Sequence, residues 1–294
     1  MGAEHTAIRH WYTARMHALN VDLHCHSTAS DGLLSPTELV RRAHQNGAQM
    51  LALTDHDELA GLPEARIAAN ACGIHFIDGV EISVSYCDQS VHIVGLGINA
   101  TDPTLVKGLA QVRGGRDGRA RLMGDELEKI GIHGAYEGAA ALAGNPALIS
   151  RAHFARYLVE IGLVRDTQTV FDHYLVRGKP GFVEHEWASL TDAVGWIHAA
   201  GGLAVIAHPG RYRLSRTEMG ALFRMFADLG GDAVEVVTSA HTPKMMSEYA
   251  SVARKYKFMA SRASDFHGPG ESAIDVGRAP QLPPDLTPVW SRLS

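Results

Sequence analysis

The sequence is poor in cysteine, and the cysteines it has form no recognisable pairing pattern. Only Cys25, Cys72 and Cys87 occur among 294 residues, and none belongs to a CxxC motif. An odd number of cysteines without this spacing argues against a disulfide framework and against a structural zinc knuckle. We therefore expect a protein of a reducing compartment, the cytoplasm.

The sequence also lacks long hydrophobic runs and an excess of positive charge. No apolar run reaches the roughly 20 residues that a membrane-spanning helix requires, and the first residues lack the apolar segment of a signal peptide. The formal net charge is −5. Such a chain is poorly suited to coating long nucleic acid, although it can still bind small phosphorylated ligands, and we expect no membrane partner.

Histidine, in contrast, is abundant. The chain holds 17 histidines against 4 tryptophans and 8 phenylalanines, and 46% of its residues are hydrophobic. This composition is typical of a globular protein with room for one large α/β domain or a domain with an insertion. The excess of imidazole suggests a metal site.

Strand and helix signals alternate from residue 20 onward, which is typical of a mainly parallel sheet or barrel. The helix at 35–47 has the clearest signals, with Ser35 as N-cap, Glu38 completing a capping box and Gly47 as terminator. Further helices are expected at 61–73, 189–202, 217–231 and up to 257. Seven strands are expected, at 20–26, 49–57, 74–83, 90–98, 203–210, 232–239 and 258–270.

The alternation is interrupted in the middle of the chain, where residues 101–180 show helical patterns and no clear strand. We interpret this stretch as a helical insertion that caps the substrate. The expected organisation is an N-terminal extension at 1–19, a metal-binding barrel at 20–100 and 181–294, and the insertion between these two parts.

The first strand alternates apolar with polar side chains. Its period of two puts His24 and His26 on one face and Cys25 on the other. Two imidazoles on one face of a strand can chelate a metal ion, whereas the thiol is expected to be a small buried hydrophobe.

Imidazoles and carboxylates recur at or just after the ends of the predicted strands. In parallel α/β folds, residues at the carboxyl ends of strands converge on one pocket. A single histidine at such a position is more often a hydrogen-bonded core or surface residue. Here, however, each of two i, i+2 pairs, His24 with His26 and Asp265 with His267, points two donors from one face of a strand. Burying these donors without a cation would leave polar groups unpaired. The candidate ligands are His24, His26, Asp31, His56, Glu81, His92, His208, Asp265 and His267.

Imidazole and carboxylate without thiolate suit divalent ions such as Mn, Fe or Zn. Nine donors exceed what one ion accepts, so two or three ions are needed, with Glu81 or Asp265 as a bridge. Three ions would still lack several ligands, and open coordination positions favour a catalytic site over a closed structural one.

The chain resembles the polymerase and histidinol phosphatase (PHP) family over nearly its whole length from residue 20. The resemblance is carried by an ordered set of residues: H-x-H, D, the histidine of "TDHD", E, H, H and D-x-H. The resemblance implies an α/β fold, a distorted barrel of seven βα units with a trinuclear metal centre. It also implies that the nine residues above hold about three divalent metals, with Mn preferred to Fe or Zn.

A narrower resemblance is carried by "SRAHFARYLV", "GKPGFVEHEWASL" and "AVIAHPGRY". These segments look like the bacterial 3′,5′-nucleoside bisphosphate phosphatases, whose relatives also trim short RNA from its 5′ end. The resemblance implies a phosphatase that removes the 3′-phosphate of substrates such as pAp. A 5′-3′ exoribonuclease acting on short RNA, a noncatalytic metal-stabilised module and a histidinol phosphatase remain as alternatives.

Selectivity for a second phosphate requires cations outside the metal cluster. Arg151 and His153 stand at the start of a predicted helix, where backbone N–H groups also favour an anion, and Lys179 and Arg211 lie next to glycines. We expect some of these four to bind the 5′-phosphate, the alternative being ordinary surface cations. For the arginines at 113, 116 and 119 we favour a solvated helix face over an RNA-guiding stripe, and for Phe154 and Tyr157 a core position over base stacking.

Overall fold

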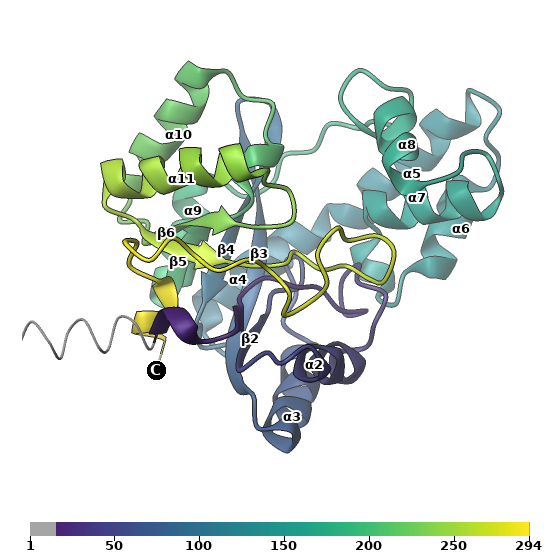
Figure 1. Cartoon of the computed structure of the whole chain (residues 1–294). Helices are drawn as coiled ribbons and strands as arrows, with labels where there is room; N and C mark the ends of the chain where they lie inside the picture. The colour runs from purple at the N-terminus through teal and green to yellow at the C-terminus, as the bar shows by residue number, and fades with distance from the viewer. Residues whose placement is uncertain (1–15, 294) are drawn as a thin grey trace, which may run out of the picture.

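The computed structural model describes residues 16–293 and contains a sheet of seven strands in consecutive order (Figure 1). Of the predicted N-terminal extension, residues 1–15 lie outside the described range. The strands are β1 (Val21–Asp22), β2 (Met50–Leu53), β3 (His75–Tyr86), β4 (Gln89–Leu96), β5 (Leu203–Ile206), β6 (Ala233–Val237) and β7 (Met259–Arg262).

The sheet curls into a nearly closed barrel. The segments that follow β1 and β7 run side by side: the His26 N–H donates to the Phe266 carbonyl at 2.9 Å and the Asp265 N–H donates to the His24 carbonyl at 2.8 Å. These hydrogen bonds join the first and last strands beyond their regular parts. The predicted seven-stranded α/β barrel is therefore confirmed.

β4 departs from the predicted parallel arrangement, because it runs antiparallel to both β3 and β5. The connection from β3 is the two-residue turn Cys87–Asp88, with φ values of 45° and 56°. A turn this short can join only antiparallel strands, since a parallel crossover needs a dozen or more residues. This reversed strand distorts the barrel.

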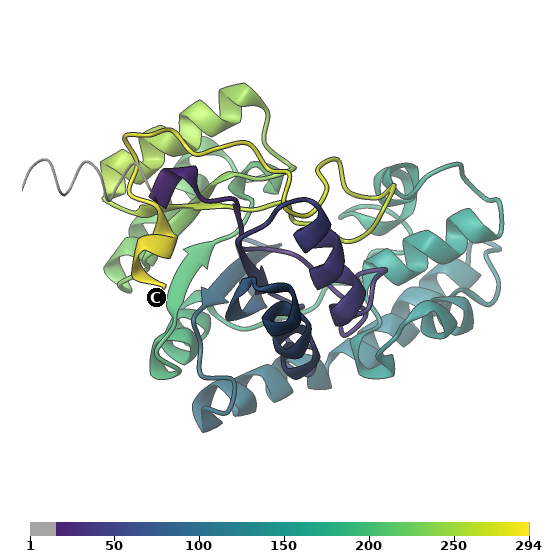
Figure 2. The ribbon, with the colours of Figure 1, turned by 60° about the horizontal axis from the view of Figure 1, so that its bottom comes forward.

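The predicted helices flank the barrel as α2 (Pro36–Gln45), α3 (Leu62–Cys72), α9 (Leu190–Ala199), α10 (Arg216–Asp228) and α11 (Pro243–Tyr256). The capping box of α2 is confirmed: the Glu38 N–H donates to Ser35 Oγ, and the Ser35 N–H donates to the Glu38 carboxylate at 2.9 Å. Helices α2 and α3 lie side by side (Figure 2). Cys25 is fully buried in the apolar cluster beneath them, as predicted.

The segment from 101 to 180 contains helices and no strand. Its helices are α4 (Pro103–Gly114), α5 (Arg116–Glu128), α6 (Ala135–Leu142), α7 (Arg151–Glu160) and α8 (Thr167–Val170). Helices α5 to α8 are grouped to one side of the barrel (Figure 1) and enclose an apolar cluster of their own, which contains Phe154 and Leu158. Leu105 and Leu109 of α4 instead belong to the barrel core, so the packing changes after α4. The division into domains stays a prediction.

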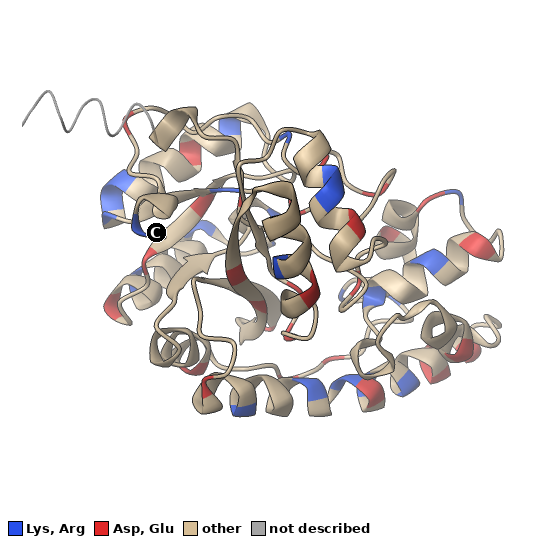
Figure 3. Cartoon of the chain, turned by 90° about the horizontal axis from the view of Figure 1, so that it is seen from below, with Lys and Arg blue, Asp and Glu red and all other residues tan. Residues whose placement is uncertain are grey.

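The surface carries both signs of charge. Lys and Arg alternate with Asp and Glu over the face seen in Figure 3, including the row formed by the helices of the segment 101–180. Among the described helices, none combines the length and the apolar character needed to cross a membrane.

Candidate metal centre

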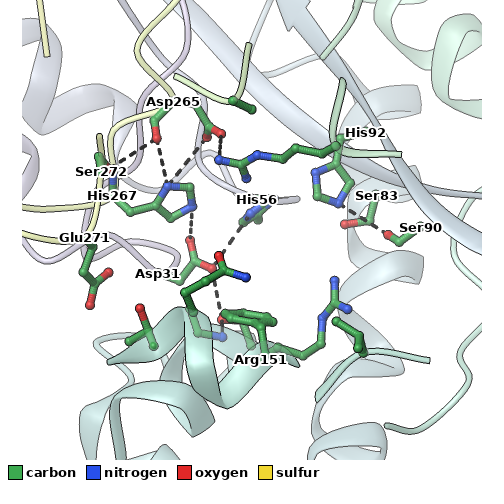
Figure 4. A pocket seen from close by; sticks show the side chains of 18 of the residues that line it. Asp31, His56, Ser83, Ser90, His92, Arg151, Asp265, His267, Glu271 and Ser272 are labelled. Atoms are coloured by element: carbon green, nitrogen blue, oxygen red, sulfur yellow. Dashed lines mark hydrogen bonds and ion pairs between the residues drawn. The ribbon is translucent and has the colours of Figure 1, made fainter. Parts of the chain in front are cut away.

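The structure brings all nine predicted ligands together at one end of the barrel, and Figure 4 shows five of them, Asp31, His56, His92, Asp265 and His267. Their donor atoms form four overlapping groups, and within each group all atoms lie within 4.8 Å of one another. The groups are His26 with Asp31, His56 and His267; His24 with Glu81 and His208; His24 with His26 and Asp265; and His56 with Glu81 and His92.

Strand geometry explains most of this convergence. The ligands from β1, β2, β5 and β7 follow the carboxyl ends of parallel strands. His92 was expected at a strand end but lies inside β4, opposite Ser83 of β3. Because β4 is antiparallel, its amino-terminal half lies at the edge where its neighbours end, and His92 reaches the cluster from there.

The loop that carries Asp31 is held by a buried carboxylate. Asp55 accepts hydrogen bonds from Ser27 Oγ at 2.7 Å and from Ser30 Oγ at 2.6 Å. Burial raises the pKa of Asp55 to about 6, against the opposing effect of these hydrogen bonds. At Gly32, an added Cβ would lie 2.3 Å from the His26 carbonyl oxygen, so the turn next to Asp31 requires glycine.

Three residues of the site have positive φ although they are not glycine: Asp57 (52°), His208 (24°) and Asp265 (52°). Positive φ is uncommon for such residues and costs of order 1–3 kcal/mol each. Two of the three are predicted ligands, so the fold holds them in conformations that place their side chains in the cluster.

Glu81 lies at the centre of the cluster. Its Oε1 is 2.9 Å from both His92 Nδ1 and His208 Nε2, and its Oε2 is 2.8 Å from His56 Nδ1. Burial opposes ionisation of Glu81, but the imidazoles around it outweigh burial and hold its pKa well below the usual value. Imidazoles also hold the pKa of Asp31 low against burial, whereas the pKa of Asp265 is held low by Arg211 first and by the imidazoles after it.

The imidazoles divide into two kinds. Burial disfavours a charged His56, yet Glu81 and Asp31 raise its pKa to about 9. The pKa of His24 is raised as well, against burial, by neighbouring carboxylates. Burial lowers the pKa of His92 and of His267 to about 4. The cluster thus combines ionised carboxylates, neutral imidazoles and imidazoles whose protons a cation can replace.

Several buried donor atoms of the cluster lack a hydrogen-bond partner among the described residues. They are His26 Nδ1, Asp31 Oδ1, His208 Nδ1 and Asp265 Oδ1. Buried polar groups are rarely left unpaired. A set of converging imidazoles and carboxylates in which several buried atoms have no hydrogen-bond partner fits divalent cations.

The four residues predicted to bind a second phosphate do not lie together in the structure. Arg151 lines the cavity above the cluster from α7, on the side opposite His92 and His267 (Figure 4). Arg211 also lines it, with Nη2 2.6 Å from Asp265 Oδ2. Lys179 is exposed and does not line the cavity.

His153 is used within its own helix. Its Nδ1 accepts the Ser150 N–H at 3.0 Å, which completes a capping box at the start of α7. The ring is 1% exposed, and burial lowers its pKa to about 4. A neutral, buried, hydrogen-bonded imidazole does not supply a positive charge to an anion.

The predicted solvated helix face of Arg113, Arg116 and Arg119 is wrong for two of the three: Arg113 belongs to α4 and is half-buried, whereas the other two belong to α5 and are buried. Arg116 and Arg119 are 5% and 8% exposed and line the cavity. Arg116 pairs with Asp57 and donates to Ser83 Oγ at 3.0 Å, and its Nε has no partner among the described residues. Burial, with Arg151 and Arg116 nearby, lowers the pKa of Arg119 to about 9. Their spacing of three predicts a shared helix face, but it does not predict whether that face points to solvent or into the protein.

Glu235 of β6 is a buried polar residue of the site that the sequence analysis missed. It is 1% exposed, and its Oε1 lies 2.7 Å from His24 Nδ1. The signal available in the sequence was a single carboxylate within the otherwise apolar strand "AVEVV".

The cavity has two lobes that share a wall formed by Arg119, Arg151 and Trp187. The metal lobe, of about 610 Å³, reaches the ligands Asp31, His56, His92, Asp265 and His267. The hairpin lobe, of about 940 Å³, extends over the β3–β4 turn and is lined by Gln89, Arg177, Phe182, Tyr212 and Arg213. Both volumes suit a nucleotide-sized ligand.

Comparison with known proteins identifies a matching domain family and similar phosphoesterases. Residues 22–110 match the PHP domain. The chain is 52% identical to a 3′,5′-nucleoside bisphosphate phosphatase of Chromobacterium violaceum, over 93% of this chain and 96% of the relative. It is 45% identical to a 5′-3′ exoribonuclease of Haemophilus influenzae, over 92% and 98%. A solved structure described as an amidohydrolase from Chromobacterium violaceum, with bound sulfate and no metal, superposes with a TM-score of 0.91 at 51% identity, covering 93% of this chain and 95% of that one.

Proposed function

Since the chain belongs to the PHP domain family, we propose that it is a metal-dependent phosphatase that hydrolyses the 3′-phosphate of nucleoside 3′,5′-bisphosphates such as pAp. The products are the nucleoside 5′-monophosphate and inorganic phosphate. One observation carries the proposal: the cluster of nine metal donors faces a cavity whose opposite wall presents buried arginines. A substrate with two phosphates matches a site with two places for an anion.

The proposed cofactors are three divalent cations, with Mn as first choice and Fe or Zn as alternatives. Four overlapping donor groups and a central Glu81 support more than one ion. Cations bound there would neutralise phosphoryl oxygens and lower the pKa of an attacking water. The nine ligands would be His24, His26, Asp31, His56, Glu81, His92, His208, Asp265 and His267.

The arginine wall, defined as Arg116, Arg119 and Arg151, is the proposed site of the 5′-phosphate. Arg116 offers an unpaired Nε, and its guanidinium is fixed by Asp57 and by Trp187, whose ring centroid lies 4.6 Å from it. Fixed guanidinium groups bind phosphate with little loss of side-chain entropy. Arg211 lies next to Asp265 and is placed to contact the scissile phosphate. His153 and Lys179 are left out of this proposal because of their positions.

The reaction balances without a covalent enzyme intermediate. Water adds to phosphorus, the bond between phosphorus and the ribose 3′-oxygen breaks, and the 3′-oxygen leaves with a proton as a hydroxyl. The arginine wall holds the substrate so that its 3′-phosphate, and not its 5′-phosphate, lies at the cluster. All three cysteines are free, which supports the proposal that the enzyme works in the reducing cytoplasm.

The proposal is tested by incubating Mn-loaded protein with pAp and analysing the products, with a chelator-treated sample as control. AMP and phosphate in the loaded sample alone support the phosphatase. Failure to release phosphate in both samples would reject it and leave the exoribonuclease, the histidinol phosphatase and the noncatalytic module.

A second candidate function is 5′-3′ exoribonuclease action on short RNA. The hairpin lobe favours it, because it continues the cavity beyond the cluster, and Arg213, which lines both lobes, has no carboxylate partner among the described residues. Such a lobe has room for a further nucleotide. Release of mononucleotides from a 5′-phosphorylated trinucleotide supports this activity, and an intact trinucleotide rejects it.

A further inference from the structure

Among the seven strands, β6 is the one that contributes no proposed ligand. β1 is followed by His24 and His26, β2 by His56 and β5 by His208, whereas the end of β6 is followed by Thr238 and Ser239. The polar contribution of β6 to the cluster comes from the middle of the strand. There Glu235 is buried behind the ligands and contacts two of them.

Both oxygens of Glu235 are engaged. Oε1 lies 2.7 Å from His24 Nδ1, and Oε2 accepts the backbone N–H of His208 at 2.6 Å. Residues 24 and 208 follow strands that are distant in the sequence and separated in the sheet. One carboxylate therefore ties together two proposed ligands from behind the cluster, while Glu81 contacts the same two histidines from within it.

We propose that Glu235 is a positioning residue that fixes His24 and His208 for cation binding. This inference rests on the proposed function, because it takes the cluster to be a metal site. Glu235 itself is not a ligand in this proposal, since both of its oxygens face the two histidines.

The contact with His24 sets the orientation of its ring. A carboxylate at Nδ1 holds a proton on that nitrogen, so in the neutral ring the lone pair is on Nε2. His24 Nε2 points into the cluster, 3.3 Å from Glu81 Oε2 and 3.6 Å from Asp265 Oδ1. Pairing of this kind between a carboxylate and a metal-binding histidine fixes the tautomer and raises the basicity of the ligand.

The contact with His208 stabilises an unusual backbone conformation. His208 has φ of 24° and lies at the start of the short turn Pro209–Arg211. A residue with positive φ that is not glycine persists only where its surroundings hold it. The short, buried hydrogen bond from the His208 N–H to Glu235 supplies such a restraint, because it fixes the nitrogen about whose bond to Cα the angle φ is defined.

The local structure of β6 aims Glu235 at the cluster. The register between β6 and β7 shifts between Glu235 and Val237, which marks an irregularity of the kind found at a β-bulge. Bulges occur next to active sites, where they redirect a side chain. The neighbours Val234 and Val236 are fully buried in the apolar core, so Glu235 alone from this strand turns toward polar partners.

The same strand offers a matched control at its other end. Asp232 accepts the Ala204 N–H and lies near a histidine ring, His198 Nε2, both at 3.0 Å. Like Glu235, it contacts one backbone N–H and one imidazole. It also lies 3.4 Å from Arg292 Nη1, and its partner His198 is 35% exposed and is not a proposed ligand. Asp232→Asn changes a similar carboxylate without touching the cluster.

The test measures Mn²⁺ affinity and the number of ions bound for the wild type, Glu235→Ala, Glu235→Gln and Asp232→Asn, by competition with a chelating dye. Thermal unfolding of the metal-free proteins is measured in parallel. We expect Glu235→Ala to bind Mn²⁺ about 10- to 100-fold more weakly. Glu235→Gln keeps the shape but has one acceptor oxygen, so its loss is smaller. Asp232→Asn retains wild-type affinity, whatever its stability.

The outcomes separate the two proposals. Wild-type affinity in both Glu235 variants, or an equal loss in Asp232→Asn, overturns the positioning role. If Glu235→Ala does not fold, Glu235→Gln decides alone. If the wild type itself binds no Mn²⁺, the metal cluster of the proposed function is rejected, and the role of Glu235 with it.

Discussion

The metal cluster and the arginine wall face each other across one cavity, but they are built in different ways. The cluster is made by residues in the strands or just after them at one edge of a nearly closed barrel, so the sheet brings most of its members together. The wall is made by Arg116 and Arg119 of α5 and Arg151 of α7, and their convergence depends on how two helices dock onto the barrel. Strand geometry makes the first region predictable from the sequence, whereas helix docking makes the second visible only in the structure.

The two regions also divide the proposed work. The cluster supplies the chemistry for breaking the P–O bond, and the arginine wall selects a substrate with a second phosphate. If this division is correct, changes in the cluster affect turnover on every substrate, whereas changes in the wall affect only substrates that carry a 5′-phosphate. The experiments below test this contrast.

The largest effect is expected from removing a ligand. His26→Ala removes an imidazole that belongs to two of the donor groups, and Asp265→Ala removes a buried carboxylate, so turnover of pAp should fall by roughly a thousandfold or more. Circular dichroism should show an intact fold, because both side chains project into the cluster and not into the apolar core. Wild-type turnover in either variant would contradict the proposed site.

The next largest effect is expected in the arginine wall. Arg151→Ala and Arg119→Ala each remove hydrogen bonds to a charged phosphate, so KM for pAp should rise roughly 10- to 100-fold. Turnover of a 3′-monophosphate, which has no 5′-phosphate, should be unchanged. Arg121→Ala is the control, since this arginine is 61% exposed on the same helix α5. Equal losses on both substrates would remove the distinction between wall and cluster.

Metal binding should depend on pH with a defined sign. The pKa of His56 is raised to about 9 in the metal-free protein, so below that pH a cation must displace its proton. Mn²⁺ affinity should therefore increase with pH, about tenfold per unit for each proton displaced, between about pH 6 and about pH 8.5. Asp31, Glu81 and Asp265 are ionised throughout, because their pKa values are lowered. Titrations in buffers across this range check the slope, and a flat profile would contradict it.

The smallest effect is expected for Lys179→Ala. Lys179 is exposed and lies outside both lobes, so kcat/KM for pAp should stay within about twofold of the wild type. A KM increase similar to that of Arg151→Ala would show that the wall extends to this segment and would enlarge the proposed phosphate site.

Much of the fold could be predicted from local signals. The capping box of Ser35 and Glu38 defines the start of α2, and alternating apolar segments locate all seven strands. The antiparallel direction of β4 was missed, although the short interval between the strands held the necessary information: no parallel crossover fits between Tyr86 and Gln89. The first strand is also shorter than expected, because regular pairing ends at Asp22 and its continuation joins β7 by isolated hydrogen bonds.

The site was predictable in proportion to its dependence on strands. All nine predicted ligands converge. The arginines of α5 were assigned to solvent because spacing along a helix identifies a shared face but not the element that covers it. His153 was assigned to an anion site because the helix start was recognised, but its ring caps that helix. Glu235 was missed because its role depends on contacts with residues 24 and 208, which are distant in the sequence.

The most direct test of the division between cluster and wall is the regiochemistry of pAp hydrolysis in ¹⁸O-labelled water. Mn-loaded protein should give 5′-AMP and labelled inorganic phosphate, since water attacks phosphorus at the cluster while the arginine wall retains the 5′-phosphate. Formation of 3′-AMP, or label in the ribose hydroxyl of the product, would contradict the account.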